Sequence, residues 1–233
     1  MLVTIHQPEH LPWLGLLAKV AVADLWVVLD DVAYRKNYFQ NRNRIMLAGE
    51  PAWVTVPVSA PHGTAIADVT IAEAPSWQRK YSGRLLQAYE QAPFPDAGSP
   101  AVELVARAGT GSSLSELNLA LFAWLAEAFG VHTPIVCSSA LGLPGAKSEL
   151  LRDICREVGA TSYLAGPSGR DYLDRSLFDS AGIQVRFFDF HHPSYPQQTP
   201  EFMPGMSAVD ALANVGLQAA KSLLSDSSDL AEA

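Results

Sequence analysis

Residues 5–15 (Ile-His-Gln-Pro-Glu-His-Leu-Pro-Trp-Leu-Gly) place polar side chains directly after a short apolar segment. His6 can donate, accept or carry a proton near neutral pH, and Gln7 can hold a ligand amide or oxygen from both sides. Two prolines stiffen this turn, so its polar groups need little ordering when a ligand binds. We therefore take His6 as the candidate general base, with Gln7 and Trp13 as candidate substrate-binding residues.

A pair of carboxylates, Asp30 and Asp31, ends the next apolar segment along the chain. If the two segments are neighbouring parallel strands, their ends lie side by side, and a carboxylate near His6 orients the imidazole and raises its basicity. Asp30 is thus the second candidate catalytic residue. The alternative is that it is an ordinary turn residue at the end of a strand.

A more polar cluster follows, at Lys36 and Asn41-Arg42-Asn43. The guanidinium of Arg42 offers a planar fork for a carboxylate or phosphate, and the two asparagines can hold sugar hydroxyls, amides or turn backbone. Lys36 can pair with an anionic substrate. We expect one cavity to be lined by His6, Gln7, Asp30, Lys36, Asn41 and Arg42, with Asn43 as a further binding residue; the alternative is a structured polar loop.

Two later segments complete the candidate site. Gly166-Pro167-Ser168-Gly169-Arg170 lies between a predicted strand and a predicted helix, where backbone amides can bind an anion, so Gly166 and Ser168 are candidate binding residues. A tight turn without a ligand is the equal alternative, since the P-loop spacing is absent. His192 and Tyr195 lie in an extended aromatic segment that either covers the pocket or docks on the core.

Metal and covalent chemistry are less well supported. His6, His10 and Asp30 or Asp31 are possible zinc ligands, but their spacing identifies no complete set, so no metal is predicted and no cofactor is assigned. Cys137 lies at the end of a predicted strand, where a thiolate is useful, although a cysteine in an apolar strand is more often inert packing.

Hydrophobic patterning predicts the elements that position these residues. A strand, a helix and a second strand fill the first 30 residues, and strands and helices alternate again from 134 to 188, which favours parallel pairing. We expect a three-layer α/β fold with a mostly parallel, Rossmann-like sheet and a helical middle segment. The predicted organisation is a single α/β domain over 1–233, a possible helical insertion or sub-lobe over 92–133, an irregular segment over 35–46 and a frayed C-terminus over 226–233.

Composition narrows the class of ligand. The chain has 233 residues, 48% of them apolar and 17% charged, with a net charge of −8, which argues against nucleic acid and anionic membranes as partners. A locally basic pocket on an acidic protein suits a small anionic substrate. Two cysteines make no disulfide framework, and we expect neither a signal peptide nor a membrane span, which indicates a soluble cytoplasmic protein.

The order of these motifs resembles the WbqC-like family over nearly the whole chain. The opening signature His-Gln-Pro-x-x-Leu-Pro-Trp-x-Gly starts at His6, and the likeness continues through later positions. Two positions depart from the family pattern: His10 stands where tyrosine is usual, and Ala33 where glutamine is frequent. The later matching residues are Lys19, Asp24, Leu29-Asp30, Lys36, Asn41-Arg42-Asn43, Trp53–Val58, Tyr163–Gly166, Tyr172-Leu173, His192-Pro193, Tyr195 and Gln197.

The resemblance implies a substrate area, because the family is associated with bacterial surface-polysaccharide and specialised-metabolite gene sets. We therefore expect a biosynthetic transferase acting on a sugar or other polar metabolite, with acyl or aminoacyl transfer to an amino group as the first choice, since His6 can serve as base without a cofactor. The donor or substrate would be a nucleotide sugar, a carrier-bound acyl group or a nucleotide. Nucleotidylyl or adenylate-type transfer, and a non-catalytic binding partner of a sugar-modifying enzyme, remain the alternatives.

Overall fold

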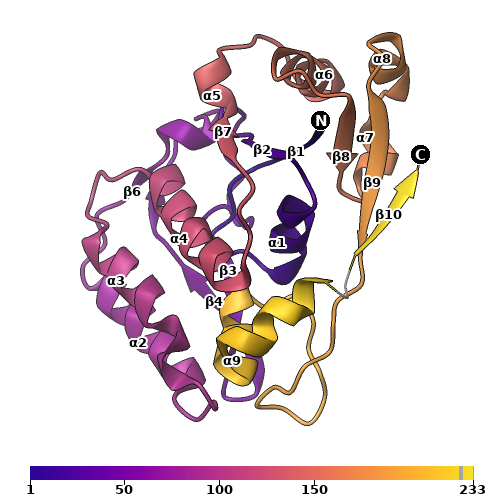
Figure 1. Cartoon of the computed structure of the whole chain (residues 1–233). Helices are drawn as coiled ribbons and strands as arrows, with labels where there is room; N and C mark the ends of the chain where they lie inside the picture. The colour runs from indigo at the N-terminus through magenta and orange to yellow at the C-terminus, as the bar shows by residue number, and fades with distance from the viewer. Residues whose placement is uncertain (226–227, 233) are drawn as a thin grey trace.

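A parallel β-sheet forms the centre of the computed structural model, which describes residues 1–225 and 228–232 (Figure 1). Its strands lie in the order β10-β9-β8-β1-β2-β7, and only β10 is antiparallel. Numbered along the chain, the five parallel strands lie 3-2-1-4-5, which is the Rossmann order. This confirms the predicted α/β class. The strands are β1 (Leu2–His6), β2 (Leu25–Val28), β7 (Ile135–Cys137), β8 (Ser162–Ala165), β9 (Gln184–Phe190) and β10 (Ser228–Glu232).

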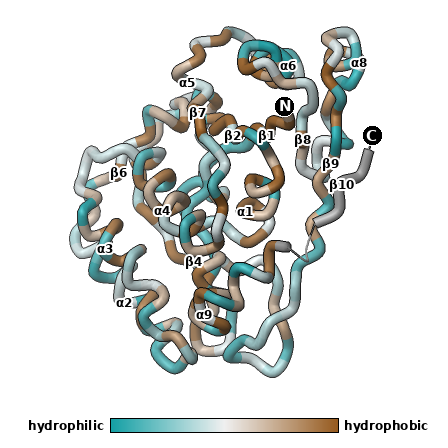
Figure 2. Tube along the Cα trace, in the orientation of Figure 1, coloured by the Kyte–Doolittle hydropathy of each residue, from teal (hydrophilic) through white to brown (hydrophobic). Residues whose placement is uncertain are grey.

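Helices cover both faces of the sheet, so the fold has three layers. Figure 1 shows α1 (Leu14–Ala21), α4 (Leu114–Phe129) and α9 (Ala208–Ser225) on one side, and α6 (Lys147–Glu157) and α8 (Arg175–Ser180) on the other. Each side has its own apolar core: the larger one includes α1, α4 and α9, and the smaller one α6 and α8. Hydrophobic residues concentrate along β1, β2 and β7 between these layers (Figure 2).

Local chemistry fixes both ends of α4, which belongs to the larger core. The hydroxyl of Ser113 accepts the backbone N–H of Glu116 at 3.2 Å, which satisfies a free donor in the first turn of α4. At the other end Gly130 adopts φ 74°, the left-handed conformation that terminates helices. Phe122, near its middle, packs on Trp26 of β2 with ring centroids 4.4 Å apart.

The middle of the chain is largely helical, as predicted. It contains α2 (Trp77–Tyr89), the 3₁₀ helix η2 (Pro95–Gly98) and α3 (Ser99–Arg107), followed by α4. Residues of α2, α3 and α4 belong to the same apolar core as α1 and α9. The division of 92–133 into a separate sub-lobe stays a prediction.

The segment after β2 corrects one sequence expectation. Residues 35–46, predicted to be irregular, include most of β3 (Arg42–Leu47), which pairs antiparallel with β4 (Glu50–Thr55). The sequence pattern did not predict this strand because a polar residue, Asn43, occupies an inward position and is fully buried, which breaks the alternation of apolar residues.

Short elements connect the larger ones. These short elements are β5 (Val58–Ser59) paired with β6 (Thr70–Ile71), the 3₁₀ helix η1 (Ile66–Asp68), α5 (Ser138–Leu141) and α7 (Gly169–Tyr172). Residues 228–232 belong to the C-terminus that was predicted to be frayed. They form β10, which pairs with β9, because a strand at the edge of a sheet leaves backbone groups free to accept a further strand. Residues 226–227 and 233 lie outside the described part of the chain.

Candidate functional site

A cavity of about 320 Å³ lies where the strand order reverses, between β1 and β8. In open α/β sheets this reversal leaves a crevice beyond the carboxyl ends of the strands, which is where ligands bind. His6 ends β1, which has parallel neighbours on both sides, as predicted from the sequence. The polar wall of the cavity includes His6, Gln7, Glu9, Lys19, Gly166 and Ser168.

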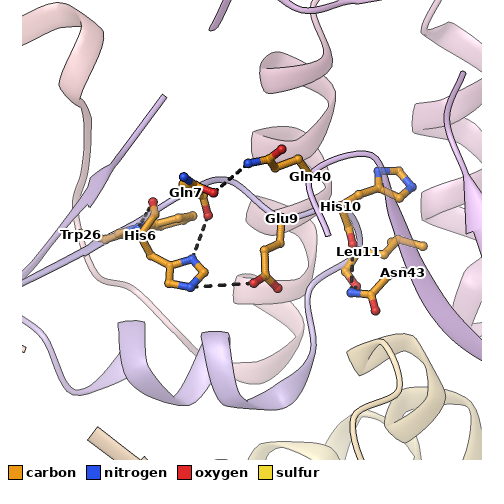
Figure 3. Close-up of polar contacts among 8 residues, drawn as sticks. All are labelled: His6, Gln7, Glu9, His10, Leu11, Trp26, Gln40 and Asn43. Carbon is orange, nitrogen blue, oxygen red and sulfur yellow. Dashed lines mark hydrogen bonds and ion pairs between the residues drawn. The ribbon is translucent and has the colours of Figure 1, made fainter. Parts of the chain in front are cut away.

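The ring of His6 has one nitrogen held and one nitrogen free. Nδ1 lies 2.9 Å from the carbonyl oxygen of Gln7, and because a carbonyl can only accept, Nδ1 carries the proton. Nε2 is therefore the basic atom, and it lies 3.8 Å from Oε1 of Glu9 (Figure 3). Burial, together with the charge of Lys19, lowers the pKa of His6 well below its usual range, so the ring is neutral at pH 7. Its side chain keeps 33% exposure, which leaves it accessible.

Glu9 and Lys19 are functional candidates that the sequence reasoning did not single out. Only 8% of Glu9 and 5% of Lys19 is exposed, although both line the cavity. Burial raises the pKa of Glu9 to about 7, opposed by the charge of Lys19. Burial lowers the pKa of Lys19 to about 8, opposed by Glu9. A usable signal was present, because Lys19 is the one charged residue in the apolar segment 14–21.

Gln7 and Trp13 line the cavity, as expected. The side-chain oxygen of Gln7 accepts the amide N–H of Gln40 at 2.7 Å, which fixes its orientation (Figure 3). The indole of Trp13 lies over Gly15, where an added Cβ would come within 2.3 Å of the ring. Gly15 thus lets the indole lie flat against the start of α1.

A buried polar network stabilises the loop between β1 and α1. The amide of Asn43 donates to the carbonyl oxygens of His10 and Leu11, at 3.1 and 2.9 Å. These bonds hold Leu11 at φ 41°, a conformation that is costly for a residue other than glycine. His10 lies against Asn118 and Tyr81, and its ring points away from that of His6 (Figure 3). The structure thus places His10 and Asn43 in support of the loop and outside the cavity wall.

Buried His10 should make the fold sensitive to acid. Burial lowers its pKa to about 4, opposed by the hydrogen bond with Asn118, whereas in the unfolded chain a histidine titrates near 6.5. Between these values the unfolded state binds more protons, so stability is full above pH 6.5 and falls toward pH 4, by up to about 1.4 kcal/mol per pH unit. Urea unfolding of His10→Gln at several pH values should show a shallower decline than wild type.

The matched control is His62→Gln, since His62 is exposed and should leave the slope unchanged. His6 contributes a decline of its own, so the slope of His10→Gln should be reduced without vanishing. A His10→Gln protein that loses stability as steeply as wild type between pH 6.5 and 4 would contradict the buried, neutral assignment.

Among the described residues Asp30 makes no hydrogen bond or ion pair with His6, so the structure does not show the expected carboxylate against the imidazole. Its Oδ1 accepts the backbone N–H of Ser139 at 2.9 Å, and its Oδ2 accepts the hydroxyl of the same residue at 2.9 Å. The carboxylate therefore ties the end of β2 to the first turn of α5. Asp31 accepts the hydroxyl of Ser138 in the same region.

Lys36, Asn41 and Arg42 also lie outside the cavity at the point where the strand order reverses, the switch-point cavity, although Tyr38 and Gln40 of the same segment line it. Arg42 donates to the backbone carbonyl of Asn37 and stacks on Trp53, with its guanidinium carbon 4.2 Å from the ring centre. Lys36 and Asn41 line another hollow, beside the loop after β2. The expected single cavity is thus wrong for these residues, because Lys36 and Asn41 face the other hollow and the guanidinium of Arg42 is held by Asn37 and Trp53.

Of the two later candidate segments, the turn after β8 lines the cavity, whereas His192 and Tyr195 of the aromatic segment do not. Gly166 and Ser168 follow β8 and line the cavity. His192 packs behind Trp13, with ring centroids 6.4 Å apart. Tyr195 is buried, and its hydroxyl donates to the carboxylate of Asp210 at 2.9 Å, so the structure shows the core-docking alternative for this residue.

Within residues 1–225 and 228–232, no three His, Cys, Asp or Glu side chains come together in a way that could hold a metal ion. None of the helices in the same part of the chain is long and apolar enough to cross a membrane.

The strand order and the cavity define an α/β protein of Rossmann-like topology with a ligand crevice at its switch point. The segment from the end of β1 to α1 lacks the Gly-x-Gly-x-x-Gly pattern of dinucleotide-binding proteins and carries His6, Gln7 and Glu9 instead. The chain belongs to the WbqC-like protein family, whose profile matches residues 7–222.

A relative in Mycobacterium tuberculosis (strain ATCC 25618 / H37Rv), named "Uncharacterized protein Rv1507c", is similar over nearly the full length of both chains. The two are 30% identical over 220 residues, which cover 93% of this chain and 95% of the relative. No solved structure matches the chain.

Proposed function

We propose that this protein is a biosynthetic transferase that moves an acyl or aminoacyl group onto an amino group of a sugar or other polar metabolite. One observation carries the proposal: Nε2 of His6 presents a free lone pair to the switch-point cavity, beside Glu9. Family membership supports a substrate area in surface-polysaccharide or specialised-metabolite formation, as the resemblance implies.

The chemistry follows from this free nitrogen. As the amine nitrogen of the acceptor attacks the carbonyl carbon of an activated acyl donor, Nε2 of His6 takes the proton that the amine loses. The bond to the donor's leaving group then breaks, and the leaving group departs with the electron pair and receives a proton. Because Nδ1–H stays bonded to the Gln7 carbonyl, the ring keeps its orientation while it carries the charge.

Nucleotidylyl or adenylate-type transfer is the second candidate. The ammonium of Lys19 and the backbone turn at 166–168 line the same cavity, and both can face a phosphate. In that reaction a nucleoside triphosphate would release pyrophosphate. A non-catalytic partner of a sugar-modifying enzyme is the third, and it would bind a ligand without turnover.

We also propose a cytoplasmic location. The thiols of Cys137 and Cys155 are unpaired in the structure. Free thiols fit a reducing compartment, where structural disulfides are rare.

A transfer assay tests the proposal. Purified protein is incubated with amine-bearing acceptors (amino sugars, nucleotide-linked amino sugars and α-amino acids) and with acyl thioesters or ATP plus a carboxylic acid. Mass spectrometry should show an acceptor heavier by one acyl group, with one thiol released per amide formed. Pyrophosphate release without an amide would favour the second candidate, and bound ligand without any product would favour the third; either result contradicts acyl transfer.

A further inference from the structure

Glu9 and Lys19 place a carboxyl group and an amino group in the wall of the cavity, and neither makes a hydrogen bond in the described part of the chain. Oε2 of Glu9 is buried and lacks a hydrogen-bond partner. Across residues 1–225 and 228–232, the ammonium of Lys19 has neither a hydrogen-bond acceptor nor an ion-pair partner. Buried charges in proteins are normally paired, because losing water costs several kcal/mol per ion. A ligand that supplies both partners removes this cost.

The two side chains approach the cavity from different elements. Glu9 comes from the loop after β1, and Lys19 from the last turn of α1, whose other residues are apolar. Each shifts the pKa of the other, yet they form no direct ion pair. Helix packing alone would favour an apolar residue at position 19, because burying an unpaired lysine ammonium costs free energy.

We propose that the cavity binds a small metabolite that carries both an amine and a carboxylate, as an α-amino acid does. Its ammonium group donates to the carboxylate of Glu9 and to Nε2 of His6, and its carboxylate accepts from Lys19. This inference rests on the proposed function, because the amine beside His6 is the nitrogen that receives the acyl group.

Charge complementarity excludes the simpler ligands. An anion without an amine pairs with Lys19 and leaves the carboxylate of Glu9 facing like charge. An amine without an anionic group pairs with Glu9 and places a second cation beside Lys19. A zwitterion aligned against the two side chains satisfies both, and a cavity of about 320 Å³ holds a molecule of this size.

Equilibrium binding tests the inference with three matched probes. Isothermal titration calorimetry compares glycine with glycine methyl ester, which lacks the carboxylate, and with N-acetylglycine, which lacks the ammonium. L-Serine serves as a larger amino acid. Glycine or L-serine should bind at least tenfold more tightly than either blocked probe, since each probe loses one charge-assisted contact.

Two variants assign the contacts. Glu9→Gln should weaken amino-acid binding at least tenfold and leave N-acetylglycine unaffected, whereas Lys19→Met should weaken it as much and leave the methyl ester unaffected. Exposed residues provide the controls Glu157→Gln and Lys221→Met, which should bind like wild type. Melting temperatures confirm folding, and Lys19→Met should melt at the same temperature or higher, because methionine needs no charged partner.

Several results would overturn the inference: no binding of either amino acid, a blocked probe that binds as tightly as glycine, or wild-type affinity in Glu9→Gln and Lys19→Met. Failure of this inference and failure of the proposed function give different experimental results. Acyl transfer to an amino sugar without amino-acid binding removes the inference alone. Amino-acid binding through Glu9 and Lys19 without transfer to any acceptor removes acyl transfer and keeps the binding site.

Discussion

Replacing His6 with alanine should lower turnover in the transfer assay by about 10²- to 10⁴-fold, the usual contribution of a general base. The cause is the loss of Nε2, the basic atom that faces the cavity. His6→Asn keeps a side chain that can hydrogen-bond to the Gln7 carbonyl but cannot take the proton, so it should be nearly as inactive. Initial rates of product formation at saturating donor and acceptor measure the effect.

The fold should survive both substitutions. A strand-end side chain that only bonds to backbone contributes about 1 kcal/mol to stability. Thermal unfolding of His6→Ala and His6→Asn should therefore show small shifts, while turnover falls by orders of magnitude. Variants that keep wild-type turnover and merely melt earlier would make His6 a structural residue.

Asp30→Ala should have the opposite signature, with a large loss of stability and little loss of turnover per folded molecule. The buried carboxylate accepts two hydrogen bonds from Ser139, and its removal leaves the partly buried N–H of Ser139 without this acceptor. We expect a loss of about 3 kcal/mol in the free energy of unfolding, since bonds to charged groups are worth more than neutral ones. Urea denaturation and active-fraction kinetics measure the two quantities.

Asp179→Ala is the matched control, because Asp179 is exposed and its carboxylate makes no comparable bond. Its stability should stay within about 0.5 kcal/mol of wild type. Catalytic participation of Asp30, as expected from its position in the sequence, would instead appear as lost turnover in Asp30→Ala with a nearly unchanged unfolding midpoint.

The part of the site that could be predicted is the part built from adjacent residues. The apolar strand, the stiff turn and the apolar helix of the first 21 residues are local patterns, and they place His6, Gln7 and Trp13 correctly at one end of the sheet. Gly166 and Ser168 follow from the same argument at a second strand. Their proximity to His6 depends on β1 and β8 being neighbours, and that strand order is a tertiary property.

The misplaced residues share another cause: their side chains are directed by partners distant in sequence. Asp30 turns toward Ser139, more than 100 residues away, and Arg42 stacks on Trp53 across a hairpin. Neither partner leaves a signal in the local pattern. Glu9 and Lys19 were missed for a different reason, since a charged residue in a loop or in an apolar helix ordinarily indicates a solvent-facing position.

The central claim is that the switch-point cavity, with His6, Glu9 and Lys19 in its wall, is where the acceptor is bound and modified. A crystal structure of the protein grown with the acceptor that gives the fastest transfer tests it most directly. The predicted result is electron density for that molecule in the cavity, with its amine nitrogen within hydrogen-bonding distance of Nε2 of His6 and of the Glu9 carboxylate. Density for the acceptor in the hollow beside Lys36 and Asn41, with the switch-point cavity holding only water, would contradict the account.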